Sequence, residues 1–203
     1  MSQKYLIGIT GCSSSGKTAI GRKFFKNFGK KSIIINQDSF YKTAEGNIEE
    51  YNFDIPESID FELFENVLQD IKSNKSIIRV PIYDYKIHKR VGLKNIDIKD
   101  IKVFIIDGIF LYYYRHIREL FDIKFFVDTD LDICLSRRIK RDIAERGRTI
   151  DMVMTRYKKF VKPSYIKYIQ PVKQYANIII PFGSDNYPFL DMFCNLLTDC
   201  KNN

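Results

Sequence analysis

A phosphate-binding loop is the feature that most limits what this chain can fold into. Residues 11–18 have the sequence GCSSSGKT and match G-x-x-x-x-G-K-[ST] at every fixed position. An apolar run at residues 4–10 predicts a strand before the loop, and residues 17–28 predict a helix after it, which is the context that the motif requires. The glycines let the loop wrap tightly, so that backbone N–H groups and the helix N-terminus face an anion.

Two side chains of the loop can reach a nucleoside triphosphate. The Lys17 ammonium can contact the β- and γ-phosphates, and the Thr18 hydroxyl can hold Mg²⁺. Cys12 lies at a variable position of the motif and is expected to be a small filler residue. The sequence therefore predicts that ATP and Mg²⁺ bind at the residues Gly11, Cys12, Ser13, Ser14, Ser15, Gly16, Lys17 and Thr18.

Strands and helices alternate along the rest of the chain. Further strands are predicted at residues 32–36, 103–106, 123–127 and 177–180, and further helices at residues 59–73, 131–146, 149–161 and 188–200. This order predicts one α/β domain over residues 1–203 with a P-loop kinase fold, in which helices cover both faces of a mainly parallel sheet. Residues 76–95 predict a small β arm off the main sheet, and residues 137–160 a helical lid.

Local signals predict where one of these helices begins, where another is interrupted and how a third one packs. Ser58 is a candidate N-cap for the helix at residues 59–73, and Pro163 is expected to end or kink the helix that begins at Thr149. The helix at residues 131–146 is expected to turn an apolar stripe toward the core. This stripe consists of Leu131, Leu135, Ile139 and Ile143.

Two acids directly follow predicted strands, at the sheet edge where parallel sheets bind ligands. Asp107 ends the strand at residues 103–106 beside the loop, where it can hold Mg²⁺ or instead cap the turn before Gly108. Asp38 follows the strand at residues 32–36, where it can accept the proton of an attacking hydroxyl or instead cap a helix. The expected metal-binding residues are Thr18, Asp38 and Asp107.

The basic residues of the chain are unevenly distributed. The net charge is +8, and six basic residues crowd into twelve positions: Arg137, Arg138, Lys140, Arg141, Arg146 and Arg148. Like charges at helical spacing repel one another, so this cluster predicts an anion rather than only a solvated helix face. A nucleoside triphosphate and a nucleic acid both fit that requirement. No NKxD motif for guanine recognition follows a later strand, which argues against a regulatory GTPase.

Composition restricts the compartment in which the chain is expected to work. No run approaches the roughly 20 apolar residues of a membrane span, and the first residues are expected to form a strand rather than a signal peptide. The 4 cysteines include no CxxC pair and no zinc-like spacing. Reduced thiols in the cytoplasm, without a membrane partner, are therefore expected.

Six segments together resemble the uridine–cytidine kinase family. In chain order they are GITGCSSSGKT, QDSFYK, YNFDIPES, VPIYDYKIHKR, the DG at residues 107–108, and RRIKRDIAERGRT leading into VKP and IIIP. The resemblance runs from about Tyr5 to Asp185, nearly the whole chain. The P-loop alone indicates a superfamily, whereas QDSFY, NFD-x-P and P-x-YD-x-x-x-H-x-R are far more specific. The resemblance implies ATP-dependent phosphorylation of the 5′-hydroxyl of uridine or cytidine, in pyrimidine salvage.

The resemblance assigns a role to each matching residue. Asp38 would be the general base for the nucleoside 5′-hydroxyl, with Lys17 at the transferred phosphoryl group. Asp54 would grip the ribose diol together with Arg138, because a carboxylate accepts two hydrogen bonds. The pocket for the base would be formed by Tyr83, Tyr85, His88, Arg148 and Arg156. The ATP molecule would also contact Arg141, Arg146 and Asp185. Without the resemblance, the two tyrosines indicate sheet packing and the histidine a surface position.

Three positions depart from the family pattern. Asp107 stands where the family usually has Glu, so the carboxylate reaches less far toward a metal ion. Arg156 stands where the family usually has Gln, and an arginine only donates hydrogen bonds, so the choice between uridine and cytidine is not readable. Phe182 stands where the family often has Arg, which removes one contact near the nucleotide.

Two rival functions fit some of the same features. A P-loop kinase for another nucleoside, a sugar phosphate or a vitamin would keep the loop, and Lys86, Lys89 and Arg90 could meet a phosphorylated acceptor. A nucleic-acid-linked ATPase would use the net charge, but the basic residues cluster near the expected active site instead of forming a stripe with interleaved aromatics. A small-molecule nucleoside substrate, without nucleic acid, is therefore expected, in a homo-oligomer that the resemblance implies is a tetramer.

Overall fold

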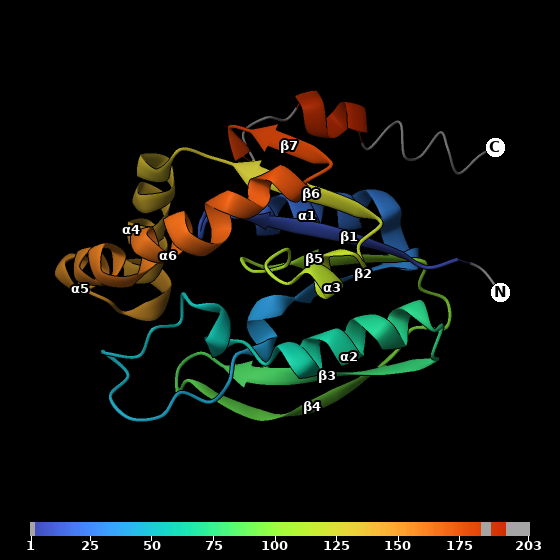
Figure 1. Ribbon diagram of the computed structural model, residues 1–203, viewed down its shortest axis with the longest axis horizontal. Helices are drawn as coiled ribbons and strands as arrows, with labels where there is room; N and C mark the ends of the chain where they lie inside the picture. Colours follow the sequence, from blue (N-terminus) through green and yellow to red (C-terminus); the bar gives the residue numbers. More distant parts are fainter. Residues whose placement is uncertain (1–2, 184–187, 194–203) are drawn as a thin grey trace.

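A five-stranded parallel sheet forms the centre of the molecule (Figure 1). The computed structural model describes residues 3–183 and 188–193. The strands of the sheet are β1 (Tyr5–Gly11), β2 (Ser32–Asn36), β5 (Val103–Asp107), β6 (Ile123–Asp128) and β7 (Ile178–Pro181). They lie in the order β2-β5-β1-β6-β7, and every neighbouring pair is parallel. The predicted α/β class and the predicted core strands are confirmed.

Side chains along each strand alternate between two buried cores. The helices over the two faces are α1 (Lys17–Phe28) on one side and α2 (Phe61–Lys72) on the other (Figure 1). On β5, Val103 and Ile105 belong to the core under α1, whereas Phe104 and Ile106 belong to the core under α2. Successive side chains of a strand point to opposite faces, so strands covered on both faces are apolar throughout.

A two-stranded antiparallel sheet, which we call the arm, lies beside α2 and apart from the main sheet (Figure 1). It consists of β3 (Ile77–Asp84) and β4 (Lys89–Asp97), so its second strand ends two residues later than predicted. Ile78 and Val80 of β3 are buried in the core under α2. The pairing shifts register between Ile82 and Tyr83.

The N-cap predicted for α2 is wrong. Asp60 caps the helix, since its Oδ1 accepts a hydrogen bond of 3.1 Å from the Leu63 N–H. Ser58 lies in a short 3-10 turn, η3 (Pro56–Ser58), and its hydroxyl donates to carbonyls of the preceding residues. Asp60 also forms an ion pair of 3.0 Å with Arg90 of the arm. One carboxylate therefore both begins α2 and ties it to the arm.

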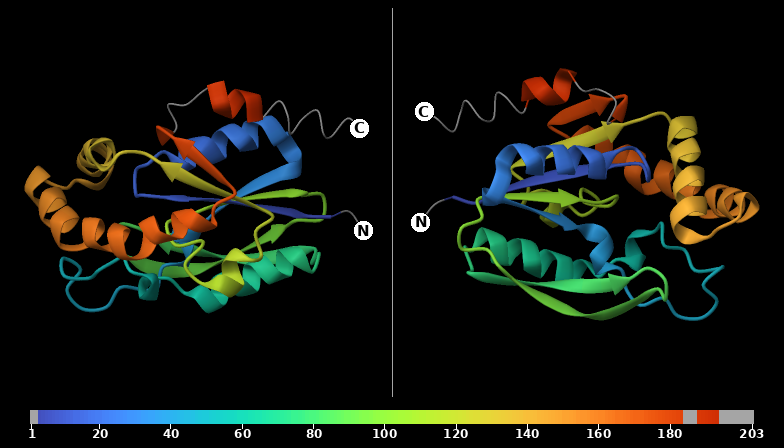
Figure 2. Two further views of the ribbon diagram at one scale, coloured as in Figure 1. Left: turned by 45° about the horizontal axis from the view of Figure 1, so that its top comes forward. Right: turned by 180° about the vertical axis from the view of Figure 1, so that it is seen from behind.

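Two helices, α4 (Leu131–Arg146) and α5 (Ile150–Arg156), lie past one end of the sheet, and we call them the lid (Figures 1 and 2). Gly147 ends α4 in the left-handed conformation. Thr149 caps α5, so this helix begins one residue later than predicted.

The expected apolar stripe of α4 is wrong at Ile143, which is 46% exposed. Leu131 packs against the core under α2, and Leu135 and Ile139 are half-buried. The buried stripe of this helix is polar and consists of Cys134, Arg138 and Asp142.

The helical path of the lid continues beyond Pro163, so of the two predicted outcomes the ending of the helix is wrong, and a local distortion around Pro163 is found instead. The path runs on through η4 (Tyr157–Val161), α6 (Lys162–Ser164), η5 (Tyr165–Ile169) and η6 (Gln170–Tyr175). Wider π-helical turns flank Pro163 on both sides, and such turns change the hydrogen-bond ladder locally. Tyr165, Ile169 and Val172 then pack into the core under α2.

The remaining described elements are short. They are η1 (Gly29–Lys31), η2 (Gln37–Phe40), α3 (Arg115–Arg118) and a helical stretch at residues 188–193. The rest of the helix predicted at residues 188–200, and Asp185, lie outside the described residues. Within the described part of the chain, no helix has both the length and the apolar character needed to cross a membrane.

Candidate active site

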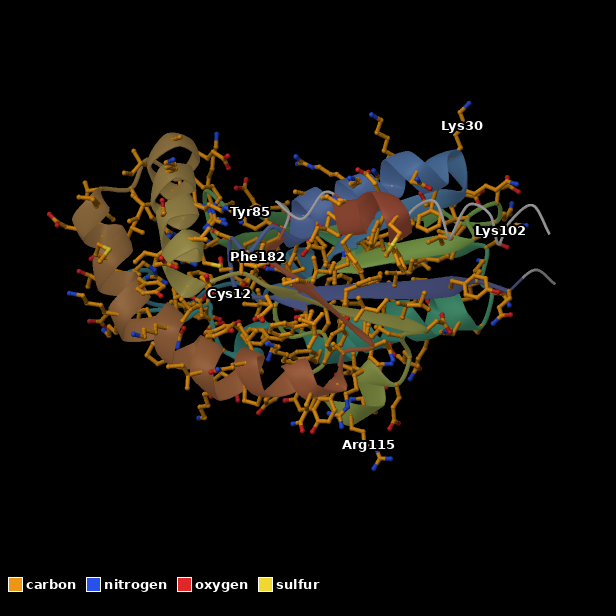
Figure 3. The ribbon with its side chains drawn as sticks, turned by 90° about the horizontal axis from the view of Figure 1, so that it is seen from above. Cys12, Lys30, Tyr85, Lys102, Arg115 and Phe182 are labelled. Atoms are coloured by element: carbon orange, nitrogen blue, oxygen red, sulfur yellow. The ribbon has the colours of Figure 1, made fainter. Side chains whose placement is uncertain are left out.

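The P-loop joins β1 to α1 as the sequence predicts. Gly16, at the start of α1, has a φ of 104°, a left-handed conformation that glycine adopts without strain. A Cβ atom on Gly11 would lie 2.5 Å from the Val127 carbonyl oxygen of the neighbouring strand, so no larger residue fits there. The Lys17 ammonium donates a hydrogen bond of 2.7 Å to the Cys12 carbonyl, which holds it against the loop. Figure 3 shows Cys12 at the same end of the molecule as the lid, far from Lys102.

Thr18 and Asp107 meet beside the P-loop. The Thr18 hydroxyl donates to Asp107 Oδ2 at 2.5 Å, and Asp107 is buried at the end of β5. Hydroxyl and carboxylate oxygens are the kind of ligand that Mg²⁺ takes. Among the described residues, no group of three or more His, Cys, Asp or Glu could hold a metal ion. The donor set therefore fits an ion that also takes ligands from phosphates and water, not a closed protein cage.

Two cavities adjoin at this edge of the sheet. The P-loop cavity has a volume of ≈ 360 Å³ and includes Lys17 and Thr18 in its lining. The second, which we call the arm cavity, has a volume of ≈ 440 Å³ and extends between the arm and the lid. The residues that line both are Ser13, Asp38, Tyr85, Ile109 and Arg141. These shared residues mark where a group bound in one cavity would meet a group bound in the other.

Asp38 lies in η2, directly after β2, where the sequence places it. Burial raises the pKa of its carboxyl group, and the negative charge of Asp107 raises it further. The positive charges of Lys17, Arg146 and Arg141 oppose this rise. Asp38 therefore stays protonated to a higher pH than an ordinary aspartate, which brings its pKa closer to the range in which proton acceptors work best.

Aromatic side chains form one wall of the arm cavity. The ring centroid of Tyr83 lies 5.7 Å from that of Tyr41 and 5.3 Å from that of Tyr85. The ring centroids of Phe53 and His88 lie 5.0 Å apart, and the planes of the two rings are tilted by 33°. Burial raises the pKa of Tyr83 to about 12, and its hydroxyl is buried without a hydrogen-bond partner. Burial and neighbouring arginines lower the pKa of His88, which favours the neutral imidazole. A flat heterocycle with polar edges suits such a wall.

Asp54 and Arg138 both line the arm cavity and both are buried, 7% and 6% exposed. Arg138 Nη1 donates to Ser13 Oγ of the P-loop at 3.1 Å, and its Nε lies 3.6 Å from Asp142 Oδ2. In this arrangement Arg138 connects the P-loop to the lid. Asp54 and Arg138 line the same cavity, and their joint contact with a ribose stays a prediction.

Asp142 is the centre of an ion-pair cluster in the lid, and its side chain is fully buried. Its carboxylate lies 2.8 Å from Arg141, 3.1 Å from Arg148, and 3.6 Å from both Arg138 and Arg146. Burial alone would raise the pKa of Asp142, but the surrounding guanidinium groups outweigh burial and lower it. Four of the five arginines that the sequence predicted as ATP or substrate contacts, all but Arg156, are thus paired with one acid.

The lid arginines divide between the two cavities. Arg141 lines both, Arg146 and Arg148 line the arm cavity, and Arg137 lines the P-loop cavity. The expected contact of Arg141 with a triphosphate agrees with its place. Arg146, expected at the triphosphate as well, lies on the arm side in this structure.

Arg156 lines the arm cavity, but its donors point at the chain segment before Asp54. Its Nη1 donates to the carbonyls of Ile48 at 3.3 Å and Glu49 at 2.9 Å, and its Nη2 donates to the carbonyl of Tyr51 at 2.9 Å. The side chain to which the resemblance assigns a contact with the base thus binds backbone carbonyls in this structure.

Tyr41, Phe53 and Asp142 belong to this site although the sequence assigned them no role, and Arg137 was predicted only as a member of the basic cluster. Tyr41 and Phe53 stand inside the segments QDSFYK and YNFDIPES, so the resemblance pointed to their neighbours without assigning them. Asp142 is an acid four residues from Arg138 and from Arg146, a spacing that indicates ion pairs on a helix. Phe182 is 69% exposed, and Asp185 lies outside the described residues.

Known proteins match the chain along nearly its whole length. The model of the Phosphoribulokinase / Uridine kinase family matches residues 6–187. Uridine-cytidine kinase B of Dictyostelium discoideum is 44% identical over 193 residues, which cover 93% of this chain and 79% of that protein. The uridine kinase of Leuconostoc citreum is 40% identical, over 94% of this chain and 93% of that protein.

Longer relatives and a solved structure complete the comparison. The chain spans only 38% of the length of uridine-cytidine kinase A of Dictyostelium discoideum, at 40% identity. The structure of phosphoribulokinase from Rhodobacter spheroides has a TM-score of 0.67 and 18% identity, and the match covers 88% of this chain and 70% of that one. At this level of identity, the structural likeness shows the fold alone.

Proposed function

This chain belongs to the phosphoribulokinase / uridine kinase family, and we propose that it transfers the γ-phosphoryl group of ATP to the 5′-hydroxyl of uridine or cytidine, giving UMP or CMP. The observation that carries the proposal is the position of Asp38, which lines both the P-loop cavity and the arm cavity. A carboxylate there faces an acceptor hydroxyl on one side and the transferred phosphoryl group on the other. The named relatives, a uridine-cytidine kinase and a uridine kinase, support the choice of acceptor.

The arm cavity suits a pyrimidine ribonucleoside. The rings of Tyr83, Tyr85 and Phe53 offer apolar faces to the base, and His88 offers a polar edge. Asp54 binds the ribose diol, since its buried carboxylate accepts two hydrogen bonds. A 2′-deoxyribonucleoside would leave part of this acceptor unpaired, so it should be a much poorer substrate.

Phosphoryl transfer then follows from the positions of the charged groups. Asp38 orients the 5′-hydroxyl and accepts its proton as the oxygen attacks the γ-phosphorus in line. Lys17 leaves the Cys12 carbonyl and binds the β- and γ-phosphates, where it stabilises the charge that develops. Arg141, which lines both cavities, neutralises the transferring group from the lid side. The lid excludes water, which would otherwise compete as acceptor.

Thr18 and Asp107 are the residues that would hold Mg²⁺ with the phosphates. Asp38, also expected as a ligand, lies close enough to Asp107 for their charges to interact, and would contact the ion through water. When bound, Mg²⁺ supplies positive charge that offsets the charge of the β- and γ-phosphate oxygens.

An ADP-release assay tests the function directly. MgATP would be supplied with uridine, cytidine, 2′-deoxyuridine, adenosine, a sugar phosphate or no acceptor, and with EDTA in place of Mg²⁺. We expect turnover with uridine or cytidine only, and none without Mg²⁺. ADP release without an acceptor would instead indicate an ATPase. Turnover restricted to a sugar phosphate would move the assignment to another kinase of the same fold.

The resemblance implies a homo-oligomer, and the exposed apolar side chains of the arm are a candidate surface for its interface. Four aliphatic side chains there are about half exposed, between 45% and 55%: Ile77, Ile82, Val91 and Leu93. We expect Leu93→Asp to lower the particle mass in light scattering, because a charge in an apolar interface is costly. The control is Lys94→Gln, on the same exposed strand. A wild-type protein that is monomeric at all concentrations would contradict the oligomer.

A further inference from the structure

We propose that Arg156 is a positioning residue that ties the lid to residues 42–55, which we call the acceptor loop, and so holds Phe53 and Asp54 in place at the arm cavity. The inference deepens the proposed function, on which it rests, because the nucleoside is the ligand that these two residues would meet. It differs from a direct contact between Arg156 and the base, which is the role that the resemblance implies.

The hydrogen bonds of Arg156 carry the proposal. Three of its N–H groups donate to three backbone carbonyls of one segment, those of Ile48, Glu49 and Tyr51, at 2.9 to 3.3 Å. A guanidinium group is planar and presents its donors as a rigid fork, so it suits several fixed acceptors at once. Hydrogen bonds from a charged donor are also stronger than those between neutral groups. These hydrogen bonds therefore hold residues 48–51 against the Arg156 side chain.

The guanidinium group of Arg156 also lies close to two aromatic rings, one in the acceptor loop and one in the helical path that follows the lid. Its central carbon lies 5.1 Å from the ring centroid of Phe160, which follows the lid, and 5.8 Å from that of Phe53 in the acceptor loop. Both distances are within the range of a cation–π interaction. The same guanidinium group thus contacts the loop backbone, a loop side chain and the helical path of the lid.

The acceptor loop needs such a tie because half of its residues are exposed. Glu45, Asn47, Glu49 and Glu50 are exposed, and the turn is closed locally by hydrogen bonds of 3.1 Å to the Asn47 carbonyl. Tyr51, whose carbonyl Arg156 binds, stands only three residues before Asp54. A displacement of the loop therefore moves the buried carboxylate that would grip the ribose, and small displacements of a substrate-binding group have large effects on affinity or rate.

The test compares Arg156→Met with Lys158→Met, which removes an exposed positive charge two residues further along. Methionine has no hydrogen-bond donor on its side chain, so Arg156→Met removes the bonds to the loop without adding a polar group that could bind the base. In Arg156→Met we expect the KM for uridine and that for cytidine each to rise about tenfold, with kcat changed less than about threefold. We also expect hydrogen–deuterium exchange at residues 46–52 to become about tenfold faster in the free protein. Lys158→Met should match the wild type in both measurements.

A second variant and the ratio between substrates separate the alternatives. Arg156→Lys keeps the charge without the planar fork, so it should restore exchange protection only in part. Unchanged exchange in Arg156→Met would overturn the proposal, as would a change in the KM for one nucleoside only, which indicates direct contact of Arg156 with the base. Should the wild type lack nucleoside turnover, the proposed function fails, and exchange at the loop still decides whether Arg156 holds it.

Discussion

Asp38→Asn should lower kcat for the nucleoside by about 10²- to 10⁴-fold, the usual contribution of a general base, while leaving ATP affinity nearly unchanged. The amide still fills the space between the two cavities, but it cannot accept the proton of the 5′-hydroxyl. The matched control is Asp97→Asn, at an exposed position of the arm. Turnover close to that of the wild type would refute the assignment of Asp38 as the base.

The pH profile gives a second view of the same carboxylate. Burial raises the pKa of Asp38, and Asp107 raises it further. The base form is therefore lost as pH falls through this raised pKa, at a higher pH than for an ordinary aspartate near 3.9. We expect kcat/KM of the wild type to fall on the acid side in this way. The residual activity of Asp38→Asn should lack that fall.

Asp142→Asn should lower the free energy of unfolding by about 3 kcal/mol, because it leaves several buried or partly buried guanidinium groups without their shared carboxylate. For a chain of this size, that corresponds to a melting temperature lower by roughly 6–12 °C. Urea unfolding followed by circular dichroism measures the change. Asp132→Asn, at an exposed position of the same helix, should change the free energy of unfolding by less than about 1 kcal/mol.

The contribution of Asp142 should also depend on pH in a definite direction. Burial opposes ionisation of this carboxyl group, but the arginines outweigh burial and hold its pKa below the ordinary value. Its stabilising effect is then fully present above the pKa of the unfolded chain and is lost as pH falls through the lowered pKa of the folded protein. The difference in stability between wild type and Asp142→Asn should shrink over that acid range. An equal difference at all pH values would contradict this account.

The sheet and the P-loop could be predicted because each depends on local signals. The apolar strands have a short, continuous pattern, and residues 11–18 carry their own turn glycines, so the predicted strands agree with β1, β2, β5, β6 and β7 within about two residues. The kinase fold and the family were likewise predicted from motifs in the sequence and are confirmed by the comparisons.

The parts that could not be predicted depend on tertiary contacts. Periodicity indicated that α4 buries Ile143, but the helix faces the polar active site instead, so the buried stripe includes Arg138 and Asp142. Pro163 is a helix breaker by propensity, yet π-helical turns around it let the path continue. Arg156 lies in a helix, and nothing in the spacing of the sequence shows that the carbonyls it binds belong to residues 48–51.

Several expectations stay predictions. They are the single domain over residues 1–203, the roles of the site residues, Mg²⁺, the cytoplasmic location, the tetramer and the absence of a nucleic-acid partner. Among the described residues, Cys12 and Cys134 are buried free thiols.

The cluster around Asp142 has a consequence for the rate at which nucleotide arrives. Four guanidinium groups share a single carboxylate, so the lid carries a surplus of positive charge. Such a surplus beside a cleft attracts polyanions before they make contact and speeds their diffusional encounter. The attraction weakens as salt shortens its range, to about 10 Å at 0.1 M ionic strength. The lid would thus attract the triphosphate from solution as well as cover it. Raising the ionic strength would lower the association rate of the triphosphate more than the rate of phosphoryl transfer.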